Sequence, residues 1–357
     1  MNSSVFAKTL LRWYLVNKRD LPWRNTKDPY IIWLSEIILQ QTRVAQGLPY
    51  FNRFINRFPS IEDLAAAPLD EVLRLWQGLG YYSRARNLHA CAQDIVNNRR
   101  GQFPTSYKEL LTLKGVGNYT AAAIASFAFG EKVAVVDGNV YRVLARYFGL
   151  AHDIGSSLGK KTFERLANEV MPDAAPDEYN QAIMEFGALQ CVPKNPACNE
   201  CPLAAGCFAF RQEMVAQLPL KENKVKVSQR AFLYFHVTCG NRIWVKQRGP
   251  KDIWQGLVDF PLEELESMDG FDLNHSRLLA ELQAFKPTID FDPEKKYKHI
   301  LTHQKIFSNF VRVLIPQAQV ANAEKWALDM GYFPVNEDQL EELGKPILIV
   351  KYLRDQK

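Results

Sequence analysis

The sequence predicts two domains, a mainly α-helical domain over residues 1–211 and an α+β domain over residues 230–357, joined by a linker over residues 212–229. A chain of 357 residues is long enough for about two domains. Apolar residues recur at helical spacing in the first part and alternate after the linker. The charge changes too, because residues 1–211 carry 24 Lys and Arg against 19 Asp and Glu, a net of +5, whereas residues 212–357 carry 20 of each.

The first helices of the N-terminal domain are marked by their caps. Asp28 suits an N-cap and Pro29 the first helical position, so a helix is expected to start there and to include the apolar sequence YIIWLSEIILQQT. Ala67-Pro68 opens a second helix, which stops at Gly78-Leu79-Gly80. A third helix is expected over residues 83–98.

A glycine-rich sequence, LKGVG at residues 113–117, separates two expected helices, 107–111 and 119–129. This order predicts a helix, a tight turn and a second helix. Residues 133–136 form a short β-branched run, and residues 140–148 are expected to form another helix.

The C-terminal domain shows the period of two that is typical of strands. The sequences RAFLYFHVT and RIWVKQR flank Cys239-Gly240-Asn241, which predicts a β-hairpin. Residues 305–315 are expected to form another strand, and residues 337–343 and 347–353 two helices. Between the domains the periodicity fades and polar, basic residues dominate, which indicates the linker.

Four of the six cysteines lie close together, in the spacing Cys191-x6-Cys198-x2-Cys201-x5-Cys207. Disulfide frameworks belong to short secreted chains, and no signal peptide is recognisable, so a cytoplasmic protein with reduced thiols is expected. One compact loop without an interleaved His favours four thiolates around a [4Fe–4S] cluster, with zinc as the alternative. The two remaining cysteines are isolated and are expected to be small buried side chains; they are Cys91 and Cys239.

Two carboxylates of the first domain are candidates for acid–base chemistry. Glu36 lies in an apolar helix, where burial would raise its pKa and let it hold and donate a proton; the alternative is an ion pair with Arg24 or Arg43. Asp137 precedes a helix, where it is expected to act as an N-cap and to stay ionised. One protonated and one ionised carboxyl is the pattern of glycosidic-bond cleavage.

The turn at residues 113–117 resembles the hairpin of helix–hairpin–helix DNA-binding proteins. Glycines let the backbone approach a phosphate closely, so DNA contacts are expected from Lys114, Gly115, Val116 and Gly117. The positive excess of the first domain fits a polyanionic partner. The alternative is an ordinary corner between two helices.

In this order the motifs resemble the helix–hairpin–helix DNA glycosylases that carry an iron–sulfur cluster, and among these the adenine DNA glycosylase (MutY) family. The resemblance runs from about Leu21 through Cys207 and implies the fold of that superfamily. The segments that carry it are LPWR (21–24), WLSEIILQQT (33–42), GLGYYSRARNL (78–88), LKGVGNYTA (113–121), VDGNVYRVLAR (136–146) and the cysteine loop.

The resemblance implies a role for each matching residue. Glu36 would protonate N7 of an adenine flipped out of duplex DNA, Asp137 would stabilise the oxocarbenium sugar, and Tyr119 would steady both. Where Tyr119 stands, the bifunctional endonuclease III branch has a Lys that forms an imine, so this chain is expected to be monofunctional. Arg24, Trp23 and Gln181 match residues that line the adenine pocket in the family, although Trp23 is alternatively an ordinary core aromatic. Further DNA contacts are expected from Gln41, Leu79 and Tyr81.

The second domain resembles a Nudix domain in RAFLYFHVTCGNRIWVKQR and IWQGLVDFP. It lacks the helix of clustered Glu that holds Mg²⁺ in Nudix hydrolases, so nucleotide hydrolysis is not expected. In the MutY family such a domain recognises 8-oxoguanine opposite the adenine, through a loop that commonly reads Phe-Ser-His. Here the loop reads Leu301-Thr302-His303, so Thr302 and His303 are the expected lesion contacts, or alternatively simple turn residues.

The expected function is therefore removal of adenine mispaired with 8-oxoguanine or guanine in duplex DNA. The expected protein is a cytoplasmic, nucleoid-associated bacterial monomer with no membrane association. An endonuclease III-like glycosylase of other specificity and a catalytically silent DNA-binding protein are the alternatives, and a Nudix nucleotide hydrolase is a third.

Overall fold

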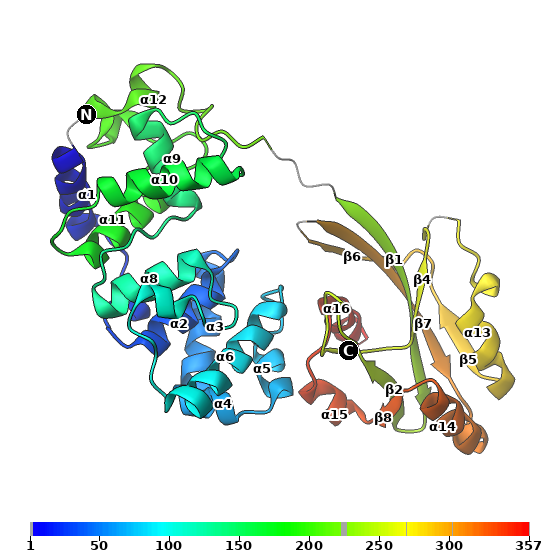
Figure 1. Ribbon diagram of the computed structural model, residues 1–357. Coiled ribbons are helices and arrows are strands. Elements are labelled where there is room, and N and C mark those ends of the chain that lie inside the picture. The colour runs from blue at the N-terminus through cyan, green and yellow to red at the C-terminus, as the bar shows by residue number, and fades with distance from the viewer. Residues whose placement is uncertain (1–2, 223–226, 269, 302, 357) are drawn as a thin grey trace. The chain divides into compact units, whose positions relative to one another are not determined.

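The computed structural model describes residues 3–222, 227–268, 270–301 and 303–356. Contacts divide the chain into two compact units, residues 1–65 with 90–224 and residues 66–89 with 225–357. The helices that precede the sheet are α1 (Ser3–Asn17), α2 (Pro29–Leu39), α3 (Val44–Arg57), α4 (Ile61–Ala66), α5 (Leu69–Leu75), α6 (Ser83–Arg99), α7 (Tyr107–Leu110), α8 (Asn118–Phe129), α9 (Gly138–Phe148), α10 (Ser157–Glu169), α11 (Pro176–Leu189) and α12 (Phe208–Arg211) (Figure 1).

Local signals position several of these helices as the sequence predicts. Asp28 caps α2, because its side chain accepts a 2.8 Å hydrogen bond from Tyr30 N. The expected helix–turn–helix around residues 113–117 is confirmed as α7 and α8. Residues 133–136 form no strand. Their backbone is hydrogen-bonded instead to the buried side chain of Asn180, which accepts from Val135 N at 3.1 Å and donates to Val133 O at 2.9 Å.

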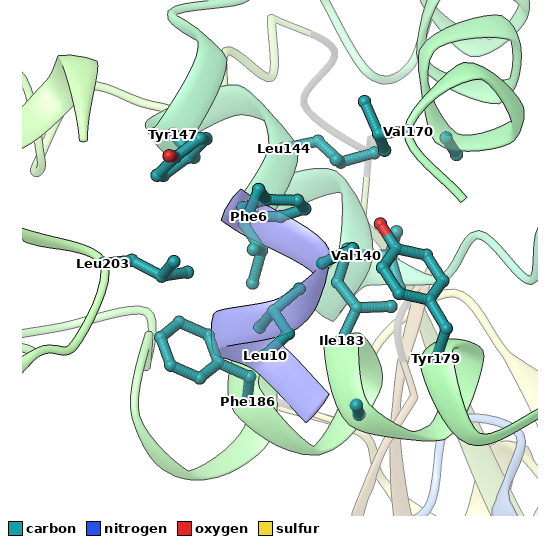
Figure 2. Packing of buried hydrophobic residues seen from close by; sticks show 14 of the residues in the cluster. Phe6, Leu10, Val140, Leu144, Tyr147, Val170, Tyr179, Ile183, Phe186 and Leu203 are labelled. Atoms are coloured by element: carbon teal, nitrogen blue, oxygen red, sulfur yellow. The ribbon is translucent and has the colours of Figure 1, made fainter. Parts of the chain in front are cut away.

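The core of the first unit brings α1 together with α9 and α11, as Figure 2 shows. Phe6 and Leu10 of α1 are fully buried there. Each such side chain contributes about 1.5–3 kcal/mol when removed from water. The residues that Figure 2 labels around them are Val140, Leu144, Tyr147, Val170, Tyr179, Ile183, Phe186 and Leu203. This packing fixes α9, which carries Asp137 at its start, relative to α11.

The second unit contains a mixed sheet of the strands β1 (Ser228–Cys239), β2 (Arg242–Gln247), β3 (Val258–Asp259), β4 (Leu262–Leu265), β5 (Thr288–Phe291), β6 (Tyr297–Ile300), β7 (Gln304–Leu314) and β8 (Phe333–Val335). Five of them follow one another in the order β3-β2-β1-β7-β5. The expected hairpin is confirmed, since Thr238 and Cys239 of β1 pair antiparallel with Ile243 and Arg242 of β2. β1 also runs parallel to β7 along eleven pairs, from Ser228↔Gln304 to Thr238↔Leu314.

The two faces of the sheet are covered separately, because alternate residues of a strand point to opposite faces. One face packs against α13 (Arg277–Leu282) and α14 (Val320–Asp329) through residues such as Phe235 and Val311. The other face carries Phe310, whose ring stacks 4.0 Å from that of Tyr352 in α16 (Ile347–Arg354). Figure 1 shows α13 and α16 on opposite sides of the sheet, with α15 (Glu337–Glu342) preceding α16.

Residues 66–89 group with the second unit, although the sequence was expected to divide at residue 211. Polar contacts join this segment to the sheet domain: Arg86 Nη1 donates to Gln255 O at 2.7 Å, and Lys345 N donates to Gln77 Oε1 at 3.0 Å. In the segment expected as a linker, Leu218 is buried in the core of the first unit and β1 already begins at Ser228. No helix in the described part of the chain is long and apolar enough to cross a membrane.

Candidate active site

Glu36 lies on α2 and only 7% of its surface is exposed. Tyr119, in the first turn of α8, donates a 2.6 Å hydrogen bond from its hydroxyl to Glu36 Oε2. Burial raises the pKa of Glu36 to about 7, while the Tyr119 bond and the Arg24 charge lower it and the Asp137 charge raises it. The sequence-based expectation of a carboxyl that holds a proton near neutral pH agrees with this environment.

Asp137 caps α9. Its Oδ1 accepts 2.8 Å hydrogen bonds from Asn139 N and Val140 N, and its Oδ2 accepts one of 2.8 Å from Asn139 Nδ2. Burial raises the pKa of Asp137 above the usual range, whereas these three bonds and the Arg142 charge lower it. The expected cap is confirmed, and burial has a larger effect on the pKa of this carboxyl than the capping bonds have.

Arg142, one turn further along α9, connects this cap to the cysteine loop. Its Nη2 donates to Asn139 Oδ1 at 2.8 Å and to Gly187 O at 2.6 Å, and its Nε donates to Cys191 O at 2.6 Å. Sequence reasoning missed Asn139 and Arg142. Their only local signal is their position in VDGNVYRVLAR, two and five residues after Asp137.

Arg24, an expected pocket residue, forms a buried ion pair that sequence reasoning also missed. Its Nη2 lies 2.7 Å from Oε2 of Glu185, a residue of α11 that is 1% exposed. Arg19 donates two hydrogen bonds to the same carboxylate, from Nε to Oε1 at 2.8 Å and from Nη2 to Oε2 at 2.5 Å. Burial alone would raise the pKa of Glu185, but the hydrogen bonds from Arg19 and Arg24 lower it to about 2. Glu185 is therefore an anion across the physiological range.

Gln181 lies one turn before Glu185 on α11, so the two side chains share a helix face. The Tyr14 hydroxyl donates a 2.7 Å hydrogen bond to Gln181 Oε1, and the Arg24 guanidinium lies 5.7 Å from the centre of the Tyr14 ring. Trp23 is 8% exposed and packs edge-on against Phe51, as an ordinary core aromatic does. The structure thus connects Arg24 and Gln181 through Tyr14 and leaves Trp23 in the core.

The residues expected to contact DNA in the first unit lie in two turns. In the turn before α8, Gly115 has a left-handed φ of +78° and Gly117 is the N-cap position. Lys114, Gly115 and Gly117 are exposed, whereas the Val116 side chain is 6% exposed and belongs to the core. Gln41, just after α2, is exposed and also has a left-handed φ, of +57°.

The four clustered cysteines line one cavity, together with apolar side chains such as Leu203. Arg146 is 3% exposed and donates from Nη1 to Cys191 Sγ at 3.4 Å and to Val192 O at 2.8 Å. Among the described residues, no three His, Cys, Asp or Glu are grouped as a single-ion metal site. Four thiols facing one cavity, with a guanidinium beside them, are a donor set that fits an iron–sulfur cluster. The four lining cysteines are Cys191, Cys198, Cys201 and Cys207.

The second unit contains a cleft lined by residues 78–83, 251–254 and 299–301 and by His303. It brings together residues that the sequence separates by more than 200 positions, since Leu79 and Tyr81 share it with His303. Tyr81 and His303 are exposed, whereas Leu79 is 7% exposed. The other expected lesion contact, Thr302, lies outside the described residues.

Comparison with known proteins finds two family models that match this chain. The family model of the HhH-GPD superfamily base excision DNA repair proteins matches residues 34–171, and that of the NUDIX domain matches residues 233–355. The chain is 37% identical over 320 residues to the adenine DNA glycosylase of Buchnera aphidicola subsp. Schizaphis graminum (strain Sg), covering 88% of each chain. It is 32% identical over 351 residues to the adenine DNA glycosylase of Buchnera aphidicola subsp. Baizongia pistaciae (strain Bp), covering 97% of this chain and 96% of that one.

Among solved structures, that of a thermostable thymine-DNA glycosylase matches with a TM-score of 0.55 and 32% identity, over 59% of this chain and 97% of that one. The fold class expected from the sequence, a helix–hairpin–helix glycosylase domain followed by a Nudix-like domain, is therefore confirmed. The resemblance extends over nearly the full length of both Buchnera relatives, and the chain belongs to the adenine DNA glycosylase family.

Proposed function

We propose that the chain is an adenine-specific DNA N-glycosylase that removes adenine mispaired with 8-oxoguanine or guanine from duplex DNA. Family membership supports adenine as the released base. The single observation that carries the chemistry is the buried Glu36 carboxyl, whose pKa is raised to about 7 and which lies within electrostatic reach of Asp137. Two carboxyls with different environments are what an acid and an anion in one site require.

Glu36 acts as the general acid. With a pKa of about 7, a large fraction of this carboxyl carries a proton at neutral pH. It gives that proton to N7 of an adenine flipped out of the duplex, and the protonated base leaves with the electron pair of the N-glycosidic bond. The Tyr119 hydroxyl, which donates to Glu36 Oε2, stabilises the carboxylate that remains.

Asp137 opposes the positive charge that develops on the sugar when the base leaves. Its carboxylate is fixed by the three hydrogen bonds of the α9 cap, so no reorientation is needed during the reaction. It stabilises the oxocarbenium electrostatically or by a transient bond to C1′, and water then adds at C1′ and loses a proton. The product is an abasic site in an uncut strand.

The reaction stops there because Tyr119 stands where bifunctional relatives place an amine. A phenol forms no imine with the abasic sugar, so strand cleavage by that route is closed. The turn at residues 113–117 supports phosphate binding, since Lys114, Gly115 and Gly117 are exposed there, just before α8. Gln41 would enter the duplex from the turn after α2.

The cysteine loop is proposed to hold a [4Fe–4S] cluster through Cys191, Cys198, Cys201 and Cys207. The shared cavity and the Arg146 guanidinium beside Cys191 support this assignment. When bound, the cluster would hold the loop in a fixed shape. Arg142 donates to Cys191 O in this loop and to Asn139 Oδ1, and Asn139 donates to Asp137. A loop of fixed shape would therefore also help to orient Asn139 toward Asp137.

Recognition of the opposite base is assigned to the cleft of the second unit, with Thr302 and His303 as the lesion contacts. His303 lines that cleft, and it shares the lining with the loop that carries Tyr81. 8-Oxoguanine differs from guanine by an oxygen at C8 and an N–H at N7, and short polar side chains on a loop can distinguish these groups.

The proposal is tested by base release from four duplexes in which adenine faces 8-oxoguanine, guanine, cytosine or thymine. We expect release opposite 8-oxoguanine and guanine, and little or none opposite cytosine and thymine. A preparation that contains iron and sulfide but releases adenine from none of the four duplexes would refute the proposed function.

A further inference from the structure

The loop between α5 and α6 has an unusual backbone. Gly78 and Gly80 have φ values of +102° and +75°, and Tyr81 has a φ of +49° although it is not a glycine. A tyrosine in the left-handed region is strained, so surrounding contacts must hold it there. The Tyr81 side chain is 37% exposed, and it lines the cleft of the second unit.

Arg84, in the first turn of α6, makes contacts that hold this loop. It is 9% exposed, and its Nη2 lies 3.2 Å from Gly80 O and 3.4 Å from Leu79 O. The same guanidinium carbon lies 5.9 Å from the centre of the Tyr81 ring. One planar cation therefore contacts both the backbone that turns and the aromatic ring that follows the turn.

Trp76, at the end of α5, completes the support. Its indole is fully buried and its Nε1 donates a 3.0 Å hydrogen bond to Gly80 O, the oxygen that Arg84 also contacts. The Arg84 guanidinium lies 5.0 Å from the centre of the Trp76 ring. Gly80 O thus receives two donors, and Arg84 lies against two aromatic rings at once.

A lysine could not replace this arrangement. The guanidinium is planar, so it can present N–H groups at its edge while its faces lie on aromatic rings, whereas an ammonium is a compact point charge. Burial lowers the pKa of Arg84 to about 10, so the group is still charged at neutral pH. These contacts therefore need a side chain that is both planar and positively charged, as arginine is.

We propose that Arg84 is a positioning residue that, with Trp76, holds the loop at residues 78–81 so that the Tyr81 ring enters the base stack when adenine leaves it. The inference rests on the proposed function, since it assigns Tyr81 a role in base extrusion. Filling the gap left by a flipped base offsets part of the cost of unstacking. A loop held in advance in the required shape loses little conformational freedom when it meets DNA.

The test is a double-mutant cycle on single-turnover release of adenine opposite 8-oxoguanine, with Arg84→Lys, Tyr81→Ala and the double variant. In the otherwise wild-type protein, Arg84→Lys is expected to slow release about tenfold or more. In the Tyr81→Ala background the same substitution should slow release less than about twofold, because the ring that Arg84 positions is already absent. The matched control is Arg74→Lys, the same substitution on α5, where the arginine pairs with the exposed Glu342. The control should release adenine at the wild-type rate.

Extrusion is followed in the same variants by the fluorescence of 2-aminopurine at the target position, measured on protein whose thermal midpoint shows that it is folded. If Arg84→Lys does not fold, Trp76→Phe, which removes the indole donor to Gly80 O and keeps a smaller aromatic ring at this position, replaces it in the cycle. Equal losses with and without the Tyr81 ring, or no loss in either background, would overturn the inference. Wild-type protein that releases no adenine would instead refute the proposed function.

Discussion

The Tyr119 hydroxyl lies 2.6 Å from Glu36 Oε2 and donates to it, which holds the pKa of this buried carboxyl below the value that burial alone would give. Because the proposed protonation of the base needs Glu36 in its acid form, the rate of excision should fall as the pH rises through about 7, the pKa of Glu36. Tyr119→Phe removes the bond that stabilises the charged form, so the pKa rises and the fall in rate moves to higher pH. Single-turnover rates between pH 5 and 9 measure both profiles, and identical profiles would show that the Tyr119 bond does not tune Glu36.

Tyr119→Lys places an amine within the same site. The lysine is expected to attack the abasic sugar and form an imine, because the bifunctional mechanism differs by having an amine at this position. A fraction of the product strands should then be cut. Borohydride should then trap a covalent protein–DNA adduct with the variant and none with the wild-type protein. A strong adduct with the wild-type protein would mean that another lysine reacts and that the chain is not monofunctional.

Glu185 is expected to matter for stability as well as for the site. Glu185→Ala leaves Arg19 and Arg24 without the carboxylate that they share, so the free energy of unfolding should fall by about 3–5 kcal/mol at pH 7. The pKa of Glu185 is lowered from 4.5 to about 2, so its stabilisation is complete above about pH 4.5 and is lost as the pH falls from there toward 2.

Urea unfolding at pH 7 measures the effect of Glu185→Ala. The matched control is Glu169→Ala, which removes an exposed pair with Arg165 and should change stability by less than about 1 kcal/mol. Equal effects of the two substitutions would contradict a buried ion pair at Glu185.

Sequence reasoning succeeded where a local pattern decides the structure. Asp28 before Pro29 predicts the start of α2, and Gly240-Asn241 between alternating segments predicts the β1–β2 hairpin; both are present. The parallel pairing of β1 with β7 could not be predicted in the same way. It joins residues 76 positions apart (304 − 228 = 76), and no turn sequence encodes such a partner.

The candidate site shows the same limit. Glu36 and Asp137 stand out in sequence because each follows a recognisable local rule, burial in an apolar helix and capping of a helix start. Glu185 gave no such signal, since its arginine partners lie 161 and 166 positions away and only the packing of α1 on α11 brings them together. The burial of Asp137, which raises its pKa, likewise has no signal in the local sequence.

Discrimination for 8-oxoguanine should depend on Thr302 and His303. The double variant Thr302→Ala/His303→Ala should lower the preference for adenine opposite 8-oxoguanine over adenine opposite guanine by about 1–3 kcal/mol, the scale of a good base contact. Excision opposite guanine should barely change, since the two side chains are proposed to contact only the groups that distinguish 8-oxoguanine from guanine. The ratio of the two rates under sub-saturating enzyme measures this preference. An unchanged ratio would place the lesion contacts elsewhere.

Asp137→Asn tests the central claim most directly. The substitution preserves size and leaves an amide oxygen that can accept from Asn139 N and Val140 N, so the cap survives while the charge is lost. The decisive measurement is single-turnover release of adenine opposite 8-oxoguanine, made alongside the affinity for the same duplex. Without the anion that is proposed to stabilise the oxocarbenium, the barrier to release should rise by several kcal/mol, which slows release on the order of a thousandfold or more, at unchanged DNA affinity. Release at close to the wild-type rate would show that Asp137 only caps α9, and the proposed mechanism would be wrong.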